Sequence, residues 1–420
     1  MQEKKETTDL TKNPLKLIRG NARACVILEP LFAIPHNMYL GYMSLYMLSF
    51  GISRELLGLI TSLGLVANMI MASCSPYITD RMGRRKALLV FGFIGWITPL
   101  IIWTIAHSIT LFIFGTLFNA FGYVTMNSFQ CLLVEDSQPQ ERVYIFNFMQ
   151  VASIASGFFA PVGGLLIKRY TLVPAMRIIL GMTAVMMSAQ FIIRHLLISE
   201  TEIGKQKIEQ MKGVKFQTVL KDYLKTLKQI KENKLLVLAI LLRTMNYIQI
   251  TIKNTFLSVL ITERLGFQAE TIAILQTFAA VIMLIVLIFV TPRLARVVGR
   301  WPIALGISFL MSSVLLILVI PTGESYFLII LTAILDALGV AITTPRVDAL
   351  AANTIKNEER SVANSLIHII LLVVTVPFGY IGGLLSALDT RLPFVLLLIL
   401  FIFCLLILRI ASNIERKNPT

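Results

Sequence analysis

The sequence predicts an all-α, polytopic membrane protein with 12 transmembrane helices in two pseudo-symmetric six-helix bundles. Three observations support this prediction: the composition, the length of the apolar segments, and their repetition in the two halves of the chain. Of the 420 residues, 56% are hydrophobic and 15% are charged, and the mean hydropathy is +0.78. Soluble domains carry about 25% charged residues, so the chain is expected in a lipid bilayer.

Twelve apolar segments reach the roughly 20 residues that a membrane span needs. Lipid offers no partner to backbone N–H and C=O groups, so continuous apolar runs of this length predict helices. The predicted spans are residues 22–50, 54–79, 87–106, 110–134, 142–167, 174–198, 235–262, 269–291, 302–320, 325–352, 360–387 and 391–411.

The positive charges predict the orientation of the chain. Most of the 38 Lys and Arg residues lie in the terminal segments and in the alternate loops on the same side of the membrane. Cationic loops stay in the cytoplasm, so we expect a multi-pass protein of the cell membrane with both termini cytoplasmic. Attraction to the anionic inner leaflet accounts for the net charge of +15, and no nucleic-acid partner is expected. The polar first 20 residues do not resemble a removable signal peptide.

One long polar interruption, residues 199–234, divides the spans six and six. The sequence on either side is repeated: Asn-Ala-Phe-Gly at 119–122 has its counterpart in Asp-Ala-Leu-Gly at 336–339, and Gly-Gly-Leu-Leu at 163–166 recurs at 382–385. Such internal repeats are the building plan of many secondary transporters.

These repeats predict three parts. Residues 1–198 form one six-helix bundle, residues 199–234 form a cytoplasmic linker, and residues 235–420 form the second bundle. Within the linker, apolar and Lys side chains alternate at helical spacing over 215–231, which predicts an amphipathic helix on the inner leaflet. A docking site for a partner is the alternative interpretation of that helix.

The loop after the second predicted span carries the most specific motif. Residues 80–86 read Asp-Arg-Met-Gly-Arg-Arg-Lys, and this string resembles the signature loop between helices 2 and 3 of the major facilitator superfamily of secondary transporters. The chain departs from the family pattern at Pro76, where a Gly is usual. The resemblance implies transport by alternating access, with a conformational gate made of the loop and two nearby acids: Asp80, Arg81, Gly83, Arg84, Arg85, Glu135 and Asp136.

Few charged residues lie inside the predicted spans, and each costs several kcal/mol unless it has a partner, a cavity or a function. Glu29 and Arg243 fall at the same depth of symmetry-related helices and could form a pair, whether as a gate or as a static contact. Asp336 has no cation one turn away on its own helix, and a carboxyl group in a low-dielectric site takes up a proton more readily. Asp336 is therefore the first choice for proton or ion coupling, followed by Glu29 and His36.

The family resemblance also implies that helices 1, 4, 7 and 10 line the central path. The polar residues of these helices are the expected substrate cavity: Asn119, Arg243, Asn246 and Asp336. No enzyme signature, phosphate-binding loop or metal-ligand spacing is present, so we expect neither cofactor nor metal. The four Cys residues all fall in spans as small apolar residues.

These features predict a secondary active transporter, most simply a proton-coupled exporter of a small amphipathic or drug-like compound. A proton-coupled symporter for a sugar or organic acid is the alternative, and a non-transporting sensor or assembly protein on the same fold is another. The expected partners are a small-molecule substrate, protons or another coupling ion, and membrane lipids, for a monomeric chain. The Gly-rich segment 157–164 resembles a drug-antiporter motif only loosely, and its counterpart at 377–383 favours close helix packing.

Overall fold

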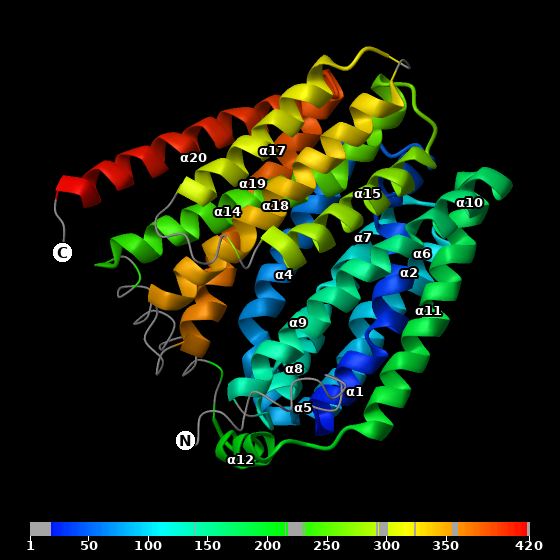
Figure 1. Cartoon of the computed structure of the whole chain (residues 1–420). Helices are drawn as coiled ribbons and strands as arrows, with labels where there is room; N and C mark the ends of the chain where they lie inside the picture. Colours follow the sequence, from blue (N-terminus) through cyan, green and yellow to red (C-terminus); the bar gives the residue numbers. More distant parts are fainter. Residues whose placement is uncertain are drawn as a thin grey trace.

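The computed structural model describes residues 18–137, 139–214, 216, 230, 232–290, 293, 301–322, 325–354 and 360–417. These residues form helices and connecting turns, with no β-strand among them (Figure 1). The α-helices of the first half are α1 (Gly20–Leu28), α2 (Pro30–Leu40), α3 (Met43–Leu48), α4 (Arg54–Met82), α5 (Arg84–Gly92), α6 (Thr98–Ile105), α7 (Ile109–Asn119), α8 (Gly122–Val134), α9 (Pro139–Ser156), α10 (Ala160–Tyr170), α11 (Leu172–Leu197) and α12 (Glu202–Gln210).

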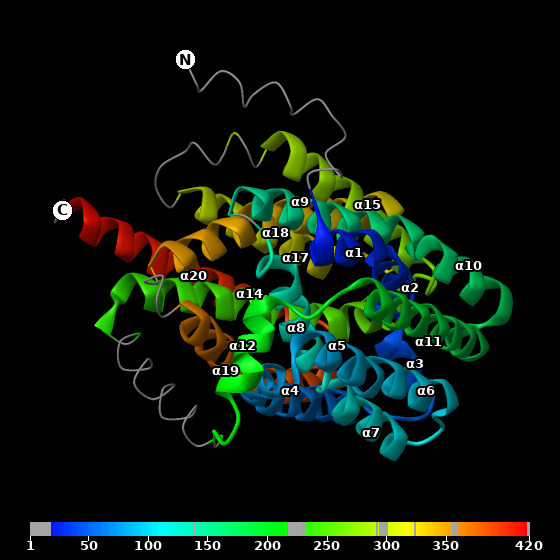
Figure 2. The same ribbon diagram turned by 90° about the horizontal axis from the view of Figure 1, so that it is seen from below.

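The second half continues with α14 (Lys234–Val259), α15 (Thr271–Ile285), α17 (Trp301–Val319), α18 (Tyr326–Thr354), α19 (Arg360–Leu388) and α20 (Leu392–Lys417). Short π-helical or 3₁₀ turns extend several of these helices: η2 (Phe93–Ile97), η3 (Gly157–Phe159), η4 (Leu260–Arg264) and η5 (Val286–Val290). In Figures 1 and 2, helices α14 and α17 to α20 gather on one side and α1, α2, α5, α6 and α11 on the other.

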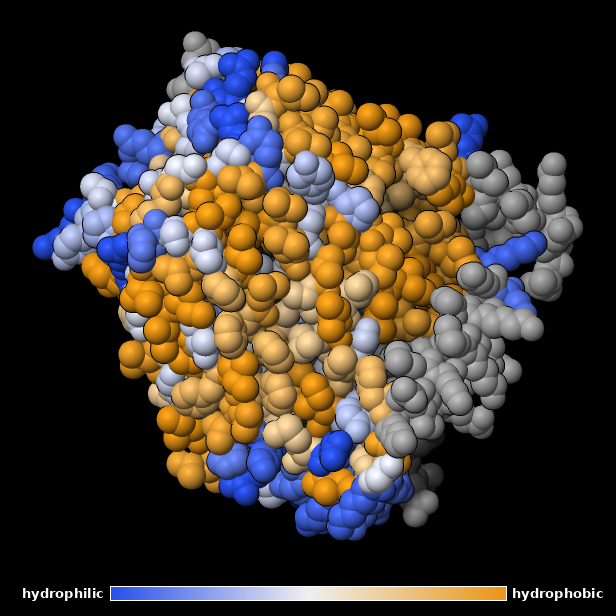
Figure 3. Space-filling model, turned by 180° about the vertical axis from the view of Figure 1, so that it is seen from behind, coloured by the Kyte–Doolittle hydropathy of each residue, from blue (hydrophilic) through white to orange (hydrophobic). Residues whose placement is uncertain are grey.

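Eleven helical segments of the described residues are long and apolar enough to cross a membrane. They coincide with the second to the twelfth predicted spans, so the structure confirms a helical, multi-span membrane protein. Figure 3 shows the corresponding surface, with apolar side chains over the middle of the molecule and hydrophilic ones toward its ends. Val185, Leu196 and Leu388 are each more than 70% exposed, as lipid-facing side chains would be.

The first predicted span, 22–50, is divided into α1, α2 and α3. Pro30 has no N–H to continue the helix, and at Glu29 the backbone N–H donates to Val26 O at 3.3 Å instead of continuing the α-helical pattern. A second break lies at Gly41 and Tyr42. The helix is therefore interrupted at Pro30, whereas α2 runs through Pro35 without interruption.

Helix α4 defines the two ends of the molecule. It contains 29 residues and is about 43 Å long at 1.5 Å per residue. We call the end where α4 begins the Arg54 end, and the end where it stops, beside Glu135 and Glu200, the Arg84 end. Along its length α4 packs against α19 from the second half of the chain (Figures 1 and 2).

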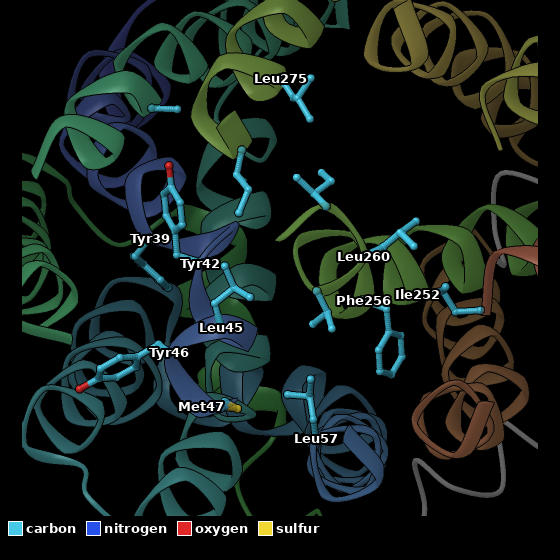
Figure 4. Close-up of a cluster of buried hydrophobic side chains, with 14 of the residues drawn as sticks. Tyr39, Tyr42, Leu45, Tyr46, Met47, Leu57, Ile252, Phe256, Leu260 and Leu275 are labelled. Atoms are coloured by element: carbon cyan, nitrogen blue, oxygen red, sulfur yellow. The ribbon is translucent and has the colours of Figure 1, made fainter. Parts of the chain in front are cut away.

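A buried cluster joins the broken first span to the second half of the chain. Figure 4 shows Tyr42, Leu45 and Tyr46 from this span on one side and Phe256 and Leu260 from α14 and η4 on the other. Tyr42, Tyr46 and Phe256 are at most 1% exposed. Aromatic side chains of this size bury 150–250 Å² each, so this cluster is a major contact between the two sequence halves.

The described part of the linker contains one helix, α12. Thr201 caps its N-terminus by accepting a hydrogen bond from Gly204 N–H at 2.9 Å, and helix capping by Thr adds about 1 kcal/mol of helix stability. The amphipathic helix predicted over 215–231 lies outside the described residues, apart from two isolated positions.

Candidate solute site and gating clusters

The signature loop folds around one buried guanidinium group at the Arg84 end. Arg84 Nη2 lies 2.9 Å from Asp80 Oδ1, and the same side chain donates to both oxygens of Glu135 at 3.0 to 3.1 Å. The Arg84 side chain is only 3% exposed. Gly83 has φ +84°, a conformation that lets α4 end and α5 begin without a side-chain clash. Asp80, Arg84 and Glu135 therefore lie together in one cluster.

Glu200 also belongs to this cluster, although the sequence did not predict it there. Its carboxylate accepts hydrogen bonds from the backbone N–H groups of Arg84 at 2.9 Å and Arg85 at 3.0 Å. It thereby caps the N-terminus of α5, where an acidic group is favoured by unpaired N–H groups and the helix dipole. The two partners are more than 110 residues apart, so no local sequence pattern could reveal the contact.

The remaining predicted gate residues lie around this cluster. Arg81 Nη1 donates to the hydroxyl of Tyr77 at 3.0 Å. Asp136 accepts from Asn21 Nδ2 at 2.9 Å, and Arg85 Nε donates to His195 O at 3.0 Å. Partial burial raises the pKa of the Asp136 carboxyl, while the hydrogen bond from Asn21 acts in the opposite direction. All these partners precede residue 215, so these contacts lie within the first half.

The suggested pair of Glu29 and Arg243 does not form. Glu29 instead lies 3.3 Å from Arg194 Nη2 of α11, and this guanidinium also donates to Cys25 O at 3.2 Å and stacks over the ring of Phe129 at 4.7 Å. Arg194 is 3% exposed. Because Glu29 and Arg194 both belong to the first half of the chain, their ion pair does not join the two halves.

The other span charges are also paired differently from the prediction. Arg243 Nε lies 3.0 Å from Asp348 Oδ1 of α18. Asp336, which was expected to lack a cation, forms an ion pair with Lys253 of α14 and accepts a further hydrogen bond from Gln249 Nε2 at 3.3 Å. The cation was missed because it lies on the neighbouring helix. Asp336 therefore lacks the isolation from cations for which it was chosen as the proton carrier.

His36 and Asn119 have local partners in the first half. His36 contacts the rings of Phe32 and Trp96, and its Nδ1 lies 3.0 Å from the hydroxyl of Tyr39. Asn119 Nδ2 donates to Gly95 O at 3.0 Å. Neither residue is among those that line the cavities described below.

A polar cavity of about 380 Å³, which we call the central cavity, lies between the two halves of the chain. Five helices contribute to it: α4 and α8 from the first half and α14, α18 and α19 from the second. Its polar lining consists of Ser75, Tyr123, Asn127, Gln130, Arg243, Asp348 and His368. A smaller cavity of about 190 Å³, between α9, α15 and α18, meets the same Asp348.

A hydrogen-bonded trio connects the halves at the central cavity. Tyr123 of α8 lies within hydrogen-bond distance of Tyr247 of α14 (3.0 Å) and of His368 Nε2 of α19 (3.1 Å). The side chains of Arg243 and Asp348 remain 31% and 50% exposed. A charged pair this exposed, partway along two spans, indicates a water-filled approach. Neither His368 nor the two tyrosines belongs to the site predicted from the sequence.

The Arg54 end is sealed by close contacts between the halves. A Cβ at Gly58 of α4 would lie 2.6 Å from Gly379 O and from Gly383 Cα of α19. One turn further along, Ser62 Oγ donates to Val376 O at 2.6 Å and accepts from Tyr380 N–H at 2.8 Å. These contacts leave no room for a solute between α4 and α19 at this level.

Two further contacts join the halves, and the first of them lies at the Arg54 end. Arg54 donates to Ser386 O at 2.9 Å and forms an ion pair with Glu263. Where η3 packs against α15, a Cβ at Gly157 would lie 2.9 Å from the Cβ of Ala280. Small residues therefore allow close helix packing here, which confirms that interpretation of the Gly-rich segment.

Comparisons with known proteins agree with this architecture. The chain resembles a solved POT family transporter in complex with 5-aminolevulinic acid, with a TM-score of 0.73 and 13% identity over 97% of this chain and 100% of the other. For a mutant of the nucleoside transporter NupG the TM-score is 0.72, with 13% identity over 93% and 99% of the chains.

The human organic anion transporter MFSD10 (TETRAN) gives a TM-score of 0.61 and 15% identity over 94% and 97% of the chains. At these identities the likeness concerns the fold. No curated protein sequence matches the chain. The family model of the Major Facilitator Superfamily matches residues 31–253 and again 239–420. Because these two matches span nearly the whole sequence, the chain belongs to the Major Facilitator Superfamily.

Proposed function

We propose that the protein is a secondary active transporter that carries a small polar solute by alternating access. One observation supports this most directly: a polar cavity between the halves is reached by solvent while the Arg54 end is sealed by backbone-to-backbone contacts. In this proposal residues 1–198 and 235–420 form two six-helix bundles that rock about the cavity, with the broken first segment, α1 to α3, serving as the twelfth span.

The lining of the central cavity favours a polar solute over the amphipathic compound predicted from sequence. Seven of its ten lining residues are polar or charged. Arg243 offers a guanidinium group, which binds carboxylates and phosphates through paired hydrogen bonds. Asp348 offers the opposite charge. A solute with at least one anionic group matches these side chains best, and this chemistry favours the symport alternative.

We assign proton coupling to His368. Imidazole is the one side chain whose ordinary pKa lies close to physiological pH. His368 lines the cavity together with Arg243 and Asp348, and it also contacts Tyr123 and Tyr247. A proton on His368 would place a second positive charge near Arg243. An anionic solute bound to Arg243 offsets that charge, so solute and proton favour each other's binding.

This coupling predicts that His368→Gln abolishes accumulation driven by a proton gradient while downhill solute movement continues. Linked equilibria of this kind typically change affinity by roughly 5- to 150-fold, so the pH dependence of uptake should fall by about tenfold or more. The measurement is uptake of radiolabelled organic acids and amino acids by proteoliposomes, with and without an imposed pH gradient.

His36→Gln is the matched control because it makes the same change away from the cavity. It should leave coupling intact. If His36→Gln uncouples transport and His368→Gln does not, the assignment to His368 is wrong. If no small polar solute moves in either direction, the proposed function itself fails, and the sensor alternative gains support.

For the signature cluster we propose a gating role at the cytoplasmic side. In the described conformation the Asp80–Arg84–Glu135 contacts lie within the first half, beside a cavity that is open to solvent. Closing the Arg84 end would bring this cluster toward the second half of the chain. Donor and acceptor groups of the cluster could then bind side chains of that half. Glu200 ties the start of the linker to the same cluster.

Orientation is tested by labelling. A Cys at Lys205 in α12, in a background without the native Cys residues, should react with a membrane-impermeant maleimide only from the cytoplasmic side. A Cys at the exposed Lys168, near the end of α10, should react only from outside. The reverse pattern would overturn the cytoplasmic placement of the termini and of the Arg84 end.

A further inference from the structure

Helices α14 and α18 face each other through a row of polar contacts. Beyond the ion pair of Arg243 with Asp348, Asn246 Nδ2 donates to Thr344 Oγ1 at 3.1 Å. The row ends at Asp336, which binds both Gln249 and Lys253. The α14 members are three or four residues apart and therefore share one face of the helix. Arg243 and Lys253 are about 15 Å apart along it.

Each end of this row lines a cavity. The central cavity holds the Arg243–Asp348 pair, and a second cavity of about 200 Å³ holds the Lys253–Asp336 pair. The second cavity lies further toward the Arg54 end, between α14, α15, α17 and α18, and Gly41 of the broken first span forms part of its wall. Both pairs have the same polarity, with the cation on α14 and the anion on α18.

The second cavity contains polar atoms that have no partner among the described residues. Ser258, which is 4% exposed, leaves its Oγ unpaired, and Gln276 leaves its Oε1 unpaired. Both residues line the cavity. Next to Asp336, the Oε1 of the buried Gln249 is also unpaired. An unpaired buried polar atom destabilises the folded protein, so these atoms point to a ligand with hydrogen-bond donors.

The chemistry of the lining identifies the ligand class. An ammonium group carries three N–H donors and a positive charge, which suits Asp336 together with the unpaired oxygens of Ser258 and Gln276. Its binding would release Lys253, whose ammonium group could then hold a carboxylate. The cavity has room for roughly six water molecules at 30 Å³ each, which matches a small amino acid.

We propose that the Lys253–Asp336 cavity is a second binding station for a small zwitterionic solute, connected to the central cavity by the polar row between α14 and α18. This inference rests on the proposed transport function and narrows its substrate class. Because cation and anion have the same arrangement at both stations, a zwitterion can bind at each without turning around. A solute with a single charge would satisfy only one member of each pair.

The test is binding of radiolabelled L-alanine to the full chain in nanodiscs, measured by equilibrium dialysis. We expect about two bound molecules per wild-type chain. Ser258→Ala combined with Gln276→Leu removes two acceptors of the second cavity without touching the central one, and should reduce the stoichiometry to about one. Ser313→Ala is the matched control, because that hydroxyl already donates to Thr332 O at 2.8 Å, and should retain two.

Competition identifies the charges that are recognised. Unlabelled propionate and ethylamine each carry one of the two charges and should compete at least tenfold more weakly than L-alanine. A wild-type stoichiometry of one, or two molecules retained by the double variant, overturns the second station. If propionate competes as strongly as L-alanine, the inference that the solute is a zwitterion is wrong. Transport of a purely anionic solute in proteoliposomes, with no binding of L-alanine, would overturn this inference and leave the proposed function standing.

Discussion

Gly58→Val is expected to break the seal at the Arg54 end. At Gly58 a Cβ would lie 2.6 Å from the carbonyl oxygen of Gly379 and from the Cα of Gly383. Both neighbours are backbone atoms, so they cannot move aside as a flexible side chain could. Overpacking of this kind costs about 1–3 kcal/mol, which would lower the population of the sealed conformation by roughly five- to 150-fold relative to conformations that separate α4 from α19.

The measurement is the labelling rate of a Cys at Ser386, a fully buried residue whose backbone oxygen accepts from Arg54. In a chain without the native Cys residues, Gly58→Val should raise this rate at least several-fold. Gly181→Val is the control, because no side chain or backbone atom lies within 4 Å of its Cβ position. Labelling at the wild-type rate in folded Gly58→Val would show that the seal does not depend on this contact.

The helical spans could be predicted from sequence because they depend on local properties. Apolar length and the exclusion of unpaired backbone groups from lipid predict each span without knowledge of its neighbours. The break at Pro30 is local as well, since it follows from the missing N–H. The break at Gly41 is not, because it places this residue against Gln276 of α15, which is more than 230 residues away.

The ion pairs could not be predicted in the same way. Symmetry between the halves indicated the depth of Glu29 and Arg243, but depth does not say which way a side chain points around its helix. The structure turns Glu29 toward Arg194 and Arg243 toward Asp348. A contact of about 3 Å requires the rotation and position of two helices to be known, and hydropathy reports neither.

The candidate site likewise contains residues that the sequence predicted and residues that only the fold brings together. Arg243 and Asp336 were expected in the cavity because they are charges inside spans, and both line cavities. Tyr123 and Tyr247 were missed because an aromatic residue in a span is ordinarily a packing residue. Only the fold shows that their hydroxyls meet each other, and that His368 joins them from the other half. The sequence of a single helix does not predict a polar site to which three helices each contribute one side chain.

Glu29→Gln is expected to destabilise the folded protein instead of changing its conformational balance. The mutation leaves Arg194, which is 3% exposed, without its carboxylate. Removing one partner of a buried ion pair costs about 3–5 kcal/mol. The lower end applies here, because Arg194 keeps its hydrogen bond to Cys25 O and its contact with the ring of Phe129.

The measurement is the midpoint of thermal unfolding, followed by the loss of monodisperse protein in detergent. Glu29→Leu combined with Arg194→Met should recover most of the lost stability, because it removes both charges together.

Arg243→Ala should change transport and leave stability nearly unaltered. Its pair with Asp348 is partly exposed to the cavity, so transport should fall while the unfolding midpoint changes little. An unchanged midpoint in Glu29→Gln, together with faster labelling of a Cys at Ser386, would place the Glu29–Arg194 pair in the gate. The expected result means that this ion pair connects α11 to the break between α1 and α2 and so stabilises the position of the first span.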